Sequence, residues 1–243
     1  MSARDKPAGT LFGLGVGPGD PELLTLKAAR ILREAPVIAY PAPLEGDSMA
    51  RRIAAPHIPE GREEIAIRMP MVPARFPAQA VYDEAAETIG AHLTAGRDVA
   101  VLCEGDPFFY GSFMYLFARL AERFRTEVVP GVSALTATAA AAHAPLAARN
   151  DVLTVLPGPL EETALVECLA RAEAVAIIKV GRHLAKVKRA LAETGLAEHA
   201  RYISHASMAE QRVLPLADLV EDTAPYFSMI LAHRRGTVWS KTQ

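Results

Sequence analysis

The chain has 243 residues, of which 51% are hydrophobic and 22% are charged, a composition typical of a folded globular protein. Its formal net charge of -2 argues against a nucleic-acid partner, because phosphate backbones are bound by clustered Lys and Arg. Two cysteines are too few for a disulfide framework, so we expect two reduced thiols and no metal site.

No stretch of the sequence predicts a membrane segment. The first nine residues are polar and charged, and they lack the apolar core of a signal peptide. The Ala-rich stretch at 128–148 is interrupted by Pro130, Gly131 and Pro145, so it predicts a buried helix between turns. We therefore expect a cytoplasmic protein with no membrane partner.

The first half of the chain alternates short β-branched runs with helical stretches. The run at 98–103 is almost continuously apolar, which is typical of a strand buried on both faces of a parallel sheet. In chain order we expect a strand at 10–15, a helix at 22–33, a strand at 36–40, a weaker strand at 64–67, a helix at 80–95, a strand at 98–103 and a helix at 109–123.

The same alternation resumes in the second half and predicts an α/β fold. Ten or so strands are too many for one open sheet, so we expect two α/β lobes, 1–125 and 126–243. The elements expected in the second lobe are a helix at 133–142, a strand at 152–156, a helix at 162–172, a strand at 174–180, a helix at 183–193, strands at 201–204 and 227–231, and a hairpin through 236–239.

A glycine-rich turn, Gly15-Val-Gly-Pro-Gly-Asp-Pro-Glu22, follows the first expected strand. Gly15, Gly17 and Gly19 permit positive φ angles and let a ligand approach the main chain without a Cβ in the way. Asp20 suits the N-cap of a following helix, and the proline after it suits the first helical position. The turn predicts a binding loop lined by main chain, with a tight strand-to-helix turn as the alternative.

This turn matches neither of the two common nucleotide-binding motifs. The dinucleotide pattern Gly-x-Gly-x-x-Gly fails from Gly13, Gly15 and Gly17, because none of these starts has glycine at the sixth position. The phosphate loop needs Gly-Lys followed by Ser or Thr, whereas Gly19 precedes Asp20. Because a carboxylate at this place repels phosphate, we expect a neutral or cationic ligand.

A second turn of similar chemistry, Glu104-Gly-Asp-Pro107, follows the strand at 98–103. Ligands of open parallel sheets bind outside the carboxyl ends of the strands, so the two turns are expected to face one cleft. The alternative is that Gly-Asp-Pro is simply a good helix start that the chain uses twice.

Three segments together resemble the tetrapyrrole methylase family: Gly15–Ala28, Glu104–Pro107 and Pro130–Thr136. They occur in the order and spacing of that family, and the strand and helix rhythm matches over nearly the whole chain. The longer segment Cys103–Leu116 is similar to the branch of the family whose members methylate precorrin-2 at C20.

The resemblance implies a homodimer of two-lobed subunits that bind S-adenosylmethionine in the cleft between the lobes, largely through main chain. One departure is visible, since many relatives have glycine at the position of Glu104, whose carboxylate could favour a cationic sulfonium. Carried onto this sequence, the implied cofactor contacts are Pro18, Glu104, Gly105, Asp106, Phe109, Ser133 and Ala134, with Val180 and Ala206 as further candidates.

The implied reaction is an SN2 transfer of the methyl group to a carbon of the macrocycle, without a metal. Because S-adenosylmethionine carries its own leaving group, no protein nucleophile is needed. Tyr110 and Glu104 are candidate acceptors for the proton that leaves, or else a packing residue and a cap. The implied substrate is a polycarboxylate, whose propionate and acetate groups arginines can bind. The candidates are Arg51, Arg52, Arg68 and Arg75. The alternative is that these arginines are solvated surface residues.

Two other functions stay open from the sequence. Another member of the same family could act elsewhere on the ring, in siroheme synthesis, or on RNA or a protein, although the low charge disfavours RNA. A nucleotide-sensing module without catalysis is the alternative outside enzymes. The sequence does not decide between a metal-free and a cobalt-containing tetrapyrrole.

Overall fold

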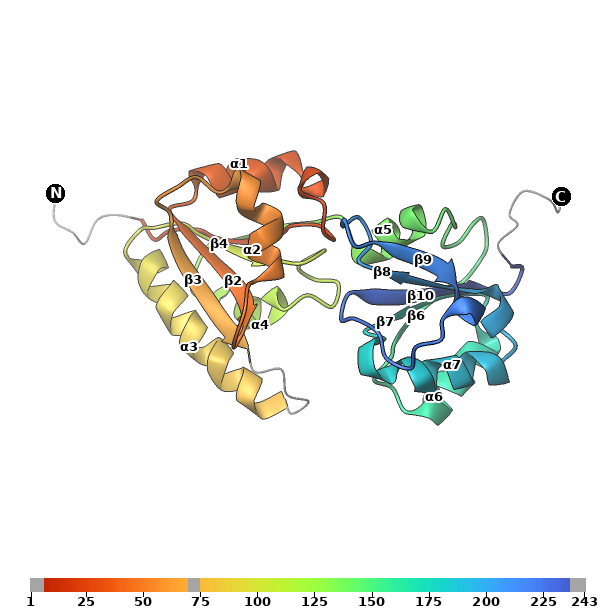
Figure 1. The fold of residues 1–243 in the computed structure, drawn as a ribbon. Helices are drawn as coiled ribbons and strands as arrows, with labels where there is room; N and C mark the ends of the chain where they lie inside the picture. The colour runs from red at the N-terminus through yellow and green to blue at the C-terminus, as the bar shows by residue number, and fades with distance from the viewer. Residues whose placement is uncertain (1–6, 70–74, 237–243) are drawn as a thin grey trace, which may run out of the picture. The chain divides into compact units, whose positions relative to one another are not determined.

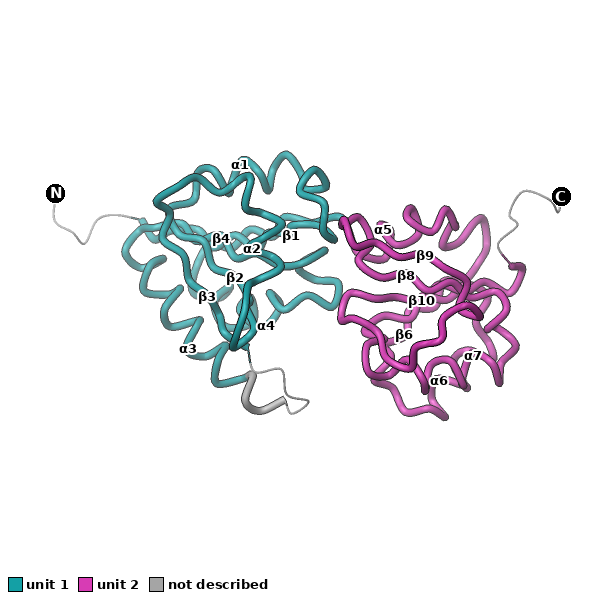
Figure 2. Tube along the Cα trace, in the orientation of Figure 1, with its two compact units in different colours: residues 1–133 teal, residues 134–243 magenta. Residues whose placement is uncertain are grey.

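The computed structural model describes residues 7–69 and 75–236, without the side chains of 75–78, and contains two compact units (Figure 1). Figure 2 distinguishes the units, residues 1–133 and 134–243. This boundary lies after the position expected at residue 125. The reason is β5 (Thr126–Val129), which pairs in parallel with β1 (Leu11–Gly15) and so belongs to the first unit.

The first unit is built on a parallel sheet with the strand order β3-β2-β4-β1-β5. The strands expected at the start of the chain are confirmed, with the weak one at 64–67 lengthened at both ends. β5 was not predicted. The other three strands of this sheet are β2 (Val37–Pro43), β3 (Glu63–Met69) and β4 (Val99–Cys103).

Helices cover both faces of this sheet, α1 and α2 on one and α3 and α4 on the other (Figure 1). Alternate residues of β4 divide between the two layers: Leu102 packs with α1 and α2, whereas Val101 and Cys103 pack with α3 and α4. This explains why the strand is apolar throughout. The helices are α1 (Leu26–Glu34), α2 (Met49–Ala54), α3 (Arg75–Thr94) and α4 (Phe113–Leu120).

Both helices expected to open at a Gly-Asp-Pro turn begin later than predicted. Asp20 caps only a short 3-10 turn, and α1 starts at Leu26, where the Thr25 hydroxyl accepts a hydrogen bond from the Ala28 amide at 3.1 Å. Residue 109 is not the start of α4, because Tyr110 adopts a left-handed conformation with φ of 57°. The interpretation of Gly-Asp-Pro as a repeated helix start is therefore wrong for both α-helices.

The second unit has a mixed sheet with the strand order β6-β7-β10-β8-β9. β6 and β7 are parallel, and the last strand, β10, pairs antiparallel with both β7 and β8. The short edge strand β9 was not predicted, and most of the hairpin expected at 236–239 lies outside the described residues. The strands are β6 (Leu153–Pro157), β7 (Ala174–Ile178), β8 (Ala200–Ser204), β9 (Arg212–Pro215) and β10 (Ser228–His233).

Helices also cover both faces of the second sheet, α5 (Ala134–Ala141) on one and α6 (Glu162–Arg171) with α7 (Leu184–Glu193) on the other. The expected helices of this half are confirmed to within a few residues. Among all helices in the described ranges, none is both long and apolar enough to span a membrane.

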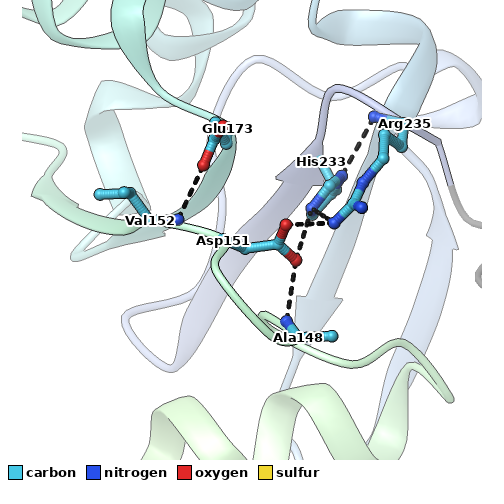
Figure 3. A network of polar contacts seen from close by, with 6 residues as sticks. All are labelled: Ala148, Asp151, Val152, Glu173, His233 and Arg235. Carbon is cyan, nitrogen blue, oxygen red and sulfur yellow. Dashed lines mark hydrogen bonds and ion pairs between the residues drawn. The ribbon is translucent and has the colours of Figure 1, made fainter.

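A polar network joins the end of β10 to the loop before β6 (Figure 3). The Asp151 carboxylate accepts from the Ala148 amide at 2.8 Å, lies 3.4 Å from His233 Nε2 and pairs with the Arg235 guanidinium. The Arg235 amide donates to His233 Nδ1 at 3.0 Å. These contacts of Asp151 fix the loop before β6 against the end of β10.

Asp151→Asn is expected to lower the melting temperature at neutral pH. The melting temperature of the variant should also change less than that of the wild type as the pH falls. The Ala148 amide, with smaller effects of His233 and Arg235, lowers the pKa of Asp151. A carboxyl with a lowered folded pKa stabilises above its unfolded value of about 3.9, and the stabilisation is lost as pH falls through the folded pKa. Thermal melts at a series of pH values should show that the melting temperatures of the variant and the wild type converge below pH of about 4. A constant difference at all pH values would contradict this.

Candidate functional site

The first unit contains a topological switch point between the neighbouring strands β1 and β4. After β1 the chain continues into α1 on one face of the sheet, and after β4 it continues into α4 on the opposite face. Where successive connections diverge in this way, the carboxyl ends of the strands leave a crevice in which α/β proteins bind ligands. Both turns singled out in the sequence lie at this point.

The two turns are joined directly by main-chain hydrogen bonds. The Gly105 amide donates to the Gly17 carbonyl at 2.8 Å, and the Gly17 amide donates back to the Gly105 carbonyl at 3.3 Å. Gly17 and Gly105 have φ angles of 80° and 64°, which residues with a Cβ rarely adopt. The two turns therefore lie side by side, as turns that face one cleft must.

The turn after β5 completes this arrangement by packing main chain against main chain. A Cβ on Gly15 would lie 2.5 Å from the Gly131 Cα, and a Cβ on Gly131 would lie 2.0 Å from the Gly105 carbonyl oxygen. The prediction that Gly15 lacks a side chain to admit a ligand is therefore wrong. Gly15 and Gly131 let three chain segments approach one another.

Asp106 ties the turn after β4 to the turn after β5. One carboxylate oxygen accepts from the Phe108 amide at 2.9 Å, and the other accepts from the Gly131 amide at 3.1 Å. The first bond closes a tight local turn and the second crosses to the neighbouring segment. The Asp106 side chain thus holds the shape of the loop, a role that the sequence did not reveal.

The loop after Asp106 folds back on itself before α4 begins. A Cβ on Gly111 would lie 2.5 Å from the Pro107 carbonyl oxygen and 2.8 Å from Cys103 Sγ. Only glycine fits there, and Tyr110 just before it takes the left-handed conformation. Sequence reasoning missed Gly111, whose only signal was a glycine four residues after Pro107.

Burial shifts the pKa values of the titratable groups around the end of β4 upward. It raises the pKa of the Cys103 thiol and raises the pKa of Tyr82 to about 12. Burial also raises the pKa of Glu104, against the opposing effect of the amides of Glu104 and Ala50. Because its pKa is raised, Cys103 is a poor nucleophile.

The other predicted cofactor contacts divide between the two units. In the first, Pro18 is buried in the turn after β1, and Ser133 is half-buried just beyond Gly131. In the second, Ala134 is the exposed first residue of α5 and Val180 is fully buried in the core. The Val180 side chain packs in the core beside β7 and α7.

Ala206, the last predicted contact, lies at the carboxyl end of β8. It is half-buried between His205 and Ser207, whose φ angles are 50° and 67°. Two left-handed residues without glycine are an unusual turn and are strained. Strain of this kind is common at functional sites, and the prediction for Ala206 is compatible with it.

One of the arginines proposed for substrate binding is already paired within the unit. Arg51 donates two hydrogen bonds to Glu64, at 2.8 and 2.9 Å, in a forked arrangement. Glu64 thus occupies the Nε and Nη2 edge of the Arg51 guanidinium. Arg68 donates to a main-chain carbonyl at 2.8 Å, and the Arg75 side chain lies outside the described residues.

Comparisons with known proteins agree with this architecture. A family model described as Tetrapyrrole (Corrin/Porphyrin) Methylases matches residues 10–220. Cobalamin biosynthesis protein CobIJ of Mycobacterium tuberculosis (strain ATCC 25618 / H37Rv) is 46% identical over 239 residues, which cover 95% of this chain and 46% of that protein. The chain therefore spans about half the length of CobIJ.

Other relatives match along nearly their whole length. A precorrin-2 C(20)-methyltransferase of Sinorhizobium sp is 42% identical, covering 92% of this chain and 94% of that protein. A cobalt-precorrin-2 C(20)-methyltransferase of Salmonella typhimurium is 33% identical, and the match covers 93% of this chain and 97% of that protein. The structure of uroporphyrin-III C-methyl transferase from Thermus thermophilus complexed with S-adenyl homocysteine shares the fold, with a TM-score of 0.67 and 24% identity. This match covers 92% of this chain and 97% of that one.

Proposed function

Because this chain belongs to the tetrapyrrole methylase family, we propose that it methylates precorrin-2 at C20 with S-adenosylmethionine as the methyl donor. The observation that carries this proposal is the match to the Sinorhizobium precorrin-2 C(20)-methyltransferase, since 42% identity extends over 92% of this chain. The relative named for cobalt-precorrin-2 is less similar, at 33% identity. This difference favours the metal-free tetrapyrrole as substrate.

The switch point of the first unit fits a cationic ligand held by main chain. The turns after β1 and β4 meet at Gly17 and Gly105, whose main-chain groups bond to each other and which carry no side chains, so a ligand can approach the main chain there. The segments 15–22 and 104–107 contain four acidic residues and no Lys or Arg. A sulfonium ion and an amino group are favoured near such carboxyl groups, whereas a phosphate is not.

In the proposed reaction a bond forms between C20 and the methyl carbon as the carbon–sulfur bond breaks. The electron pair of the broken bond goes to sulfur, and the hydrogen of C20 leaves as a proton. S-adenosylmethionine supplies both the methyl group and the leaving group. The contribution of the protein is to hold the reacting atoms in line, an effect worth up to about 7–11 kcal/mol in favourable cases.

The remaining parts of the proposal come from the resemblance. Pro18, Glu104, Asp106 and Phe109 are proposed cofactor contacts together with Gly105. Contacts from Ser133 and Ala134, and from the second unit through Val180 and Ala206, belong to the same proposal. We also propose that the protein is a cytoplasmic homodimer that works without a metal.

The purified protein is expected to bind S-adenosylhomocysteine with micromolar or tighter affinity, and to add one methyl group to precorrin-2. Calorimetry measures the binding, and mass spectrometry with absorbance measures the product, in buffer containing a chelator. Absence of both heat and thermal shift at millimolar S-adenosylhomocysteine would refute the methyltransferase function. Binding without methylation of precorrin-2 would refute only the substrate, and cobalt-precorrin-2 would then be compared.

A further inference from the structure

Three consecutive aromatic residues lie exposed directly after the turn at Gly105. The exposed fractions of Phe108, Phe109 and Tyr110 are 49%, 38% and 45%. Each such ring carries apolar area that proteins normally bury, because burial supplies much of their stability. A group of exposed rings on a folded surface is typical of a place where a partner or ligand with an apolar face binds.

The loop holds these rings in place rather than leaving them loose. Asp106 accepts from the Phe108 amide at 2.9 Å, and the Phe108 ring packs edge-on against Phe117 at 5.1 Å. Tyr110 is kept in a left-handed conformation, which costs a residue with a large side chain conformational energy. A tyrosine in a position that favours glycine or asparagine indicates that its side chain, and not its backbone preference, is what the position requires.

We propose that Tyr110 is a substrate-positioning residue whose ring contacts one face of the tetrapyrrole macrocycle, beside Phe108. This inference rests on the proposed function. The Tyr110 ring packs edge-on against Phe109, with 5.2 Å between ring centres, and the resemblance assigns residue Phe109 to the S-adenosylmethionine site. A macrocycle in contact with Tyr110 therefore lies next to the methyl donor. Stacking on aromatic rings is a common way for proteins to bind flat unsaturated ligands.

The test replaces Tyr110 in two ways that separate the ring from the backbone and from the hydroxyl. Tyr110→Asn removes the ring but tolerates the left-handed conformation, so it should fold at least as well as the wild type. Tyr110→Phe keeps the ring and removes the hydroxyl. Tyr115→Leu is the matched control, because Tyr115 is 41% exposed in the same unit but packs against Tyr82, at 4.8 Å between ring centres.

Tyr110→Asn is expected to raise the KM for precorrin-2 by about tenfold or more, as expected for the loss of one stacking contact. Its affinity for S-adenosylhomocysteine, measured by calorimetry, should not change. Tyr115→Leu should keep the KM and kcat of the wild type. Tyr110→Phe, which restores the ring, should recover the KM that Tyr110→Asn loses. A Tyr110→Phe variant that loses kcat would overturn the inference, because the hydroxyl would then be the group that matters.

Two further outcomes distinguish failure of the inference from failure of the proposed function. An active wild type together with an unchanged KM in Tyr110→Asn would overturn the inference alone. A parallel loss of S-adenosylhomocysteine affinity in Tyr110→Asn would also overturn it, since the ring would belong to the methyl-donor site. A wild type that binds S-adenosylhomocysteine but never methylates precorrin-2 would overturn the proposed substrate and this inference together.

Discussion

Gly105→Asn is expected to abolish binding of S-adenosylhomocysteine while leaving the free energy of unfolding close to that of the wild type. Gly105 has a φ angle of 64°, in the region that asparagine tolerates best among residues with a Cβ. The new side chain therefore adds little backbone strain. It would occupy the space beside the main chain of the turn, where we propose that the cofactor binds.

Gly105→Val separates obstruction of the ligand from strain of the backbone. A branched residue in the left-handed region costs about 1–3 kcal/mol, so valine should lower the denaturant midpoint as well as abolish binding. Gly61→Asn is the matched control, because Gly61 has a φ angle of 75° and nothing within 4 Å of an added Cβ. A Gly105→Asn variant that binds S-adenosylhomocysteine normally would exclude this turn from the site.

Gly131→Ala is expected to destabilise the first unit even though only one methyl group is added. The new Cβ would lie 2.0 Å from the Gly105 carbonyl oxygen and 2.7 Å from the Gly15 Cα, and both of these are main-chain atoms. Main chain at the ends of three neighbouring strands has little freedom to move. Overpacking of this kind costs about 1–3 kcal/mol or more, and the displaced turn should bind S-adenosylhomocysteine more weakly.

Gly90→Ala, in the same unit, is expected to raise stability rather than lower it. Gly90 lies inside α3, and an added Cβ would make only ordinary contacts, the nearest at 3.6 Å. Alanine should stabilise the helix by about 0.5–1 kcal/mol. Urea denaturation of both variants measures the two changes. Equal stability of Gly131→Ala and the wild type would show that the three turns are not closely packed in solution.

The sheets could be predicted largely because apolar runs and helical stretches alternate along the chain. The strand at 98–103 was evident from its composition, since a strand covered on both faces has no polar side. β5 and β9 were missed for the opposite reason. Both are short edge strands with polar residues, Thr126-Glu at the start of one and Arg212 at the start of the other, so their sequences do not differ from those of loops.

The site was predictable only where local chemistry determines the conformation. Glycine and aspartate after a strand predicted turns at the carboxyl ends, and the structure places Gly17 and Gly105 in contact there. The reason for Gly15 could not be predicted, because its neighbour Gly131 is distant in the sequence. The late start of α4 depends on the contact of Gly111 with main chain at Pro107, which no helix propensity reveals.

The central position of β10 in the second sheet has a consequence for synthesis of the protein. The last strand of the first sheet ends at Val129, so the first unit can fold on the ribosome while the rest is still being made. The second sheet cannot close until β10, which ends at His233, has left the exit tunnel. Until then β7 and β8 each expose an unpaired edge, the kind of surface on which nascent chains aggregate.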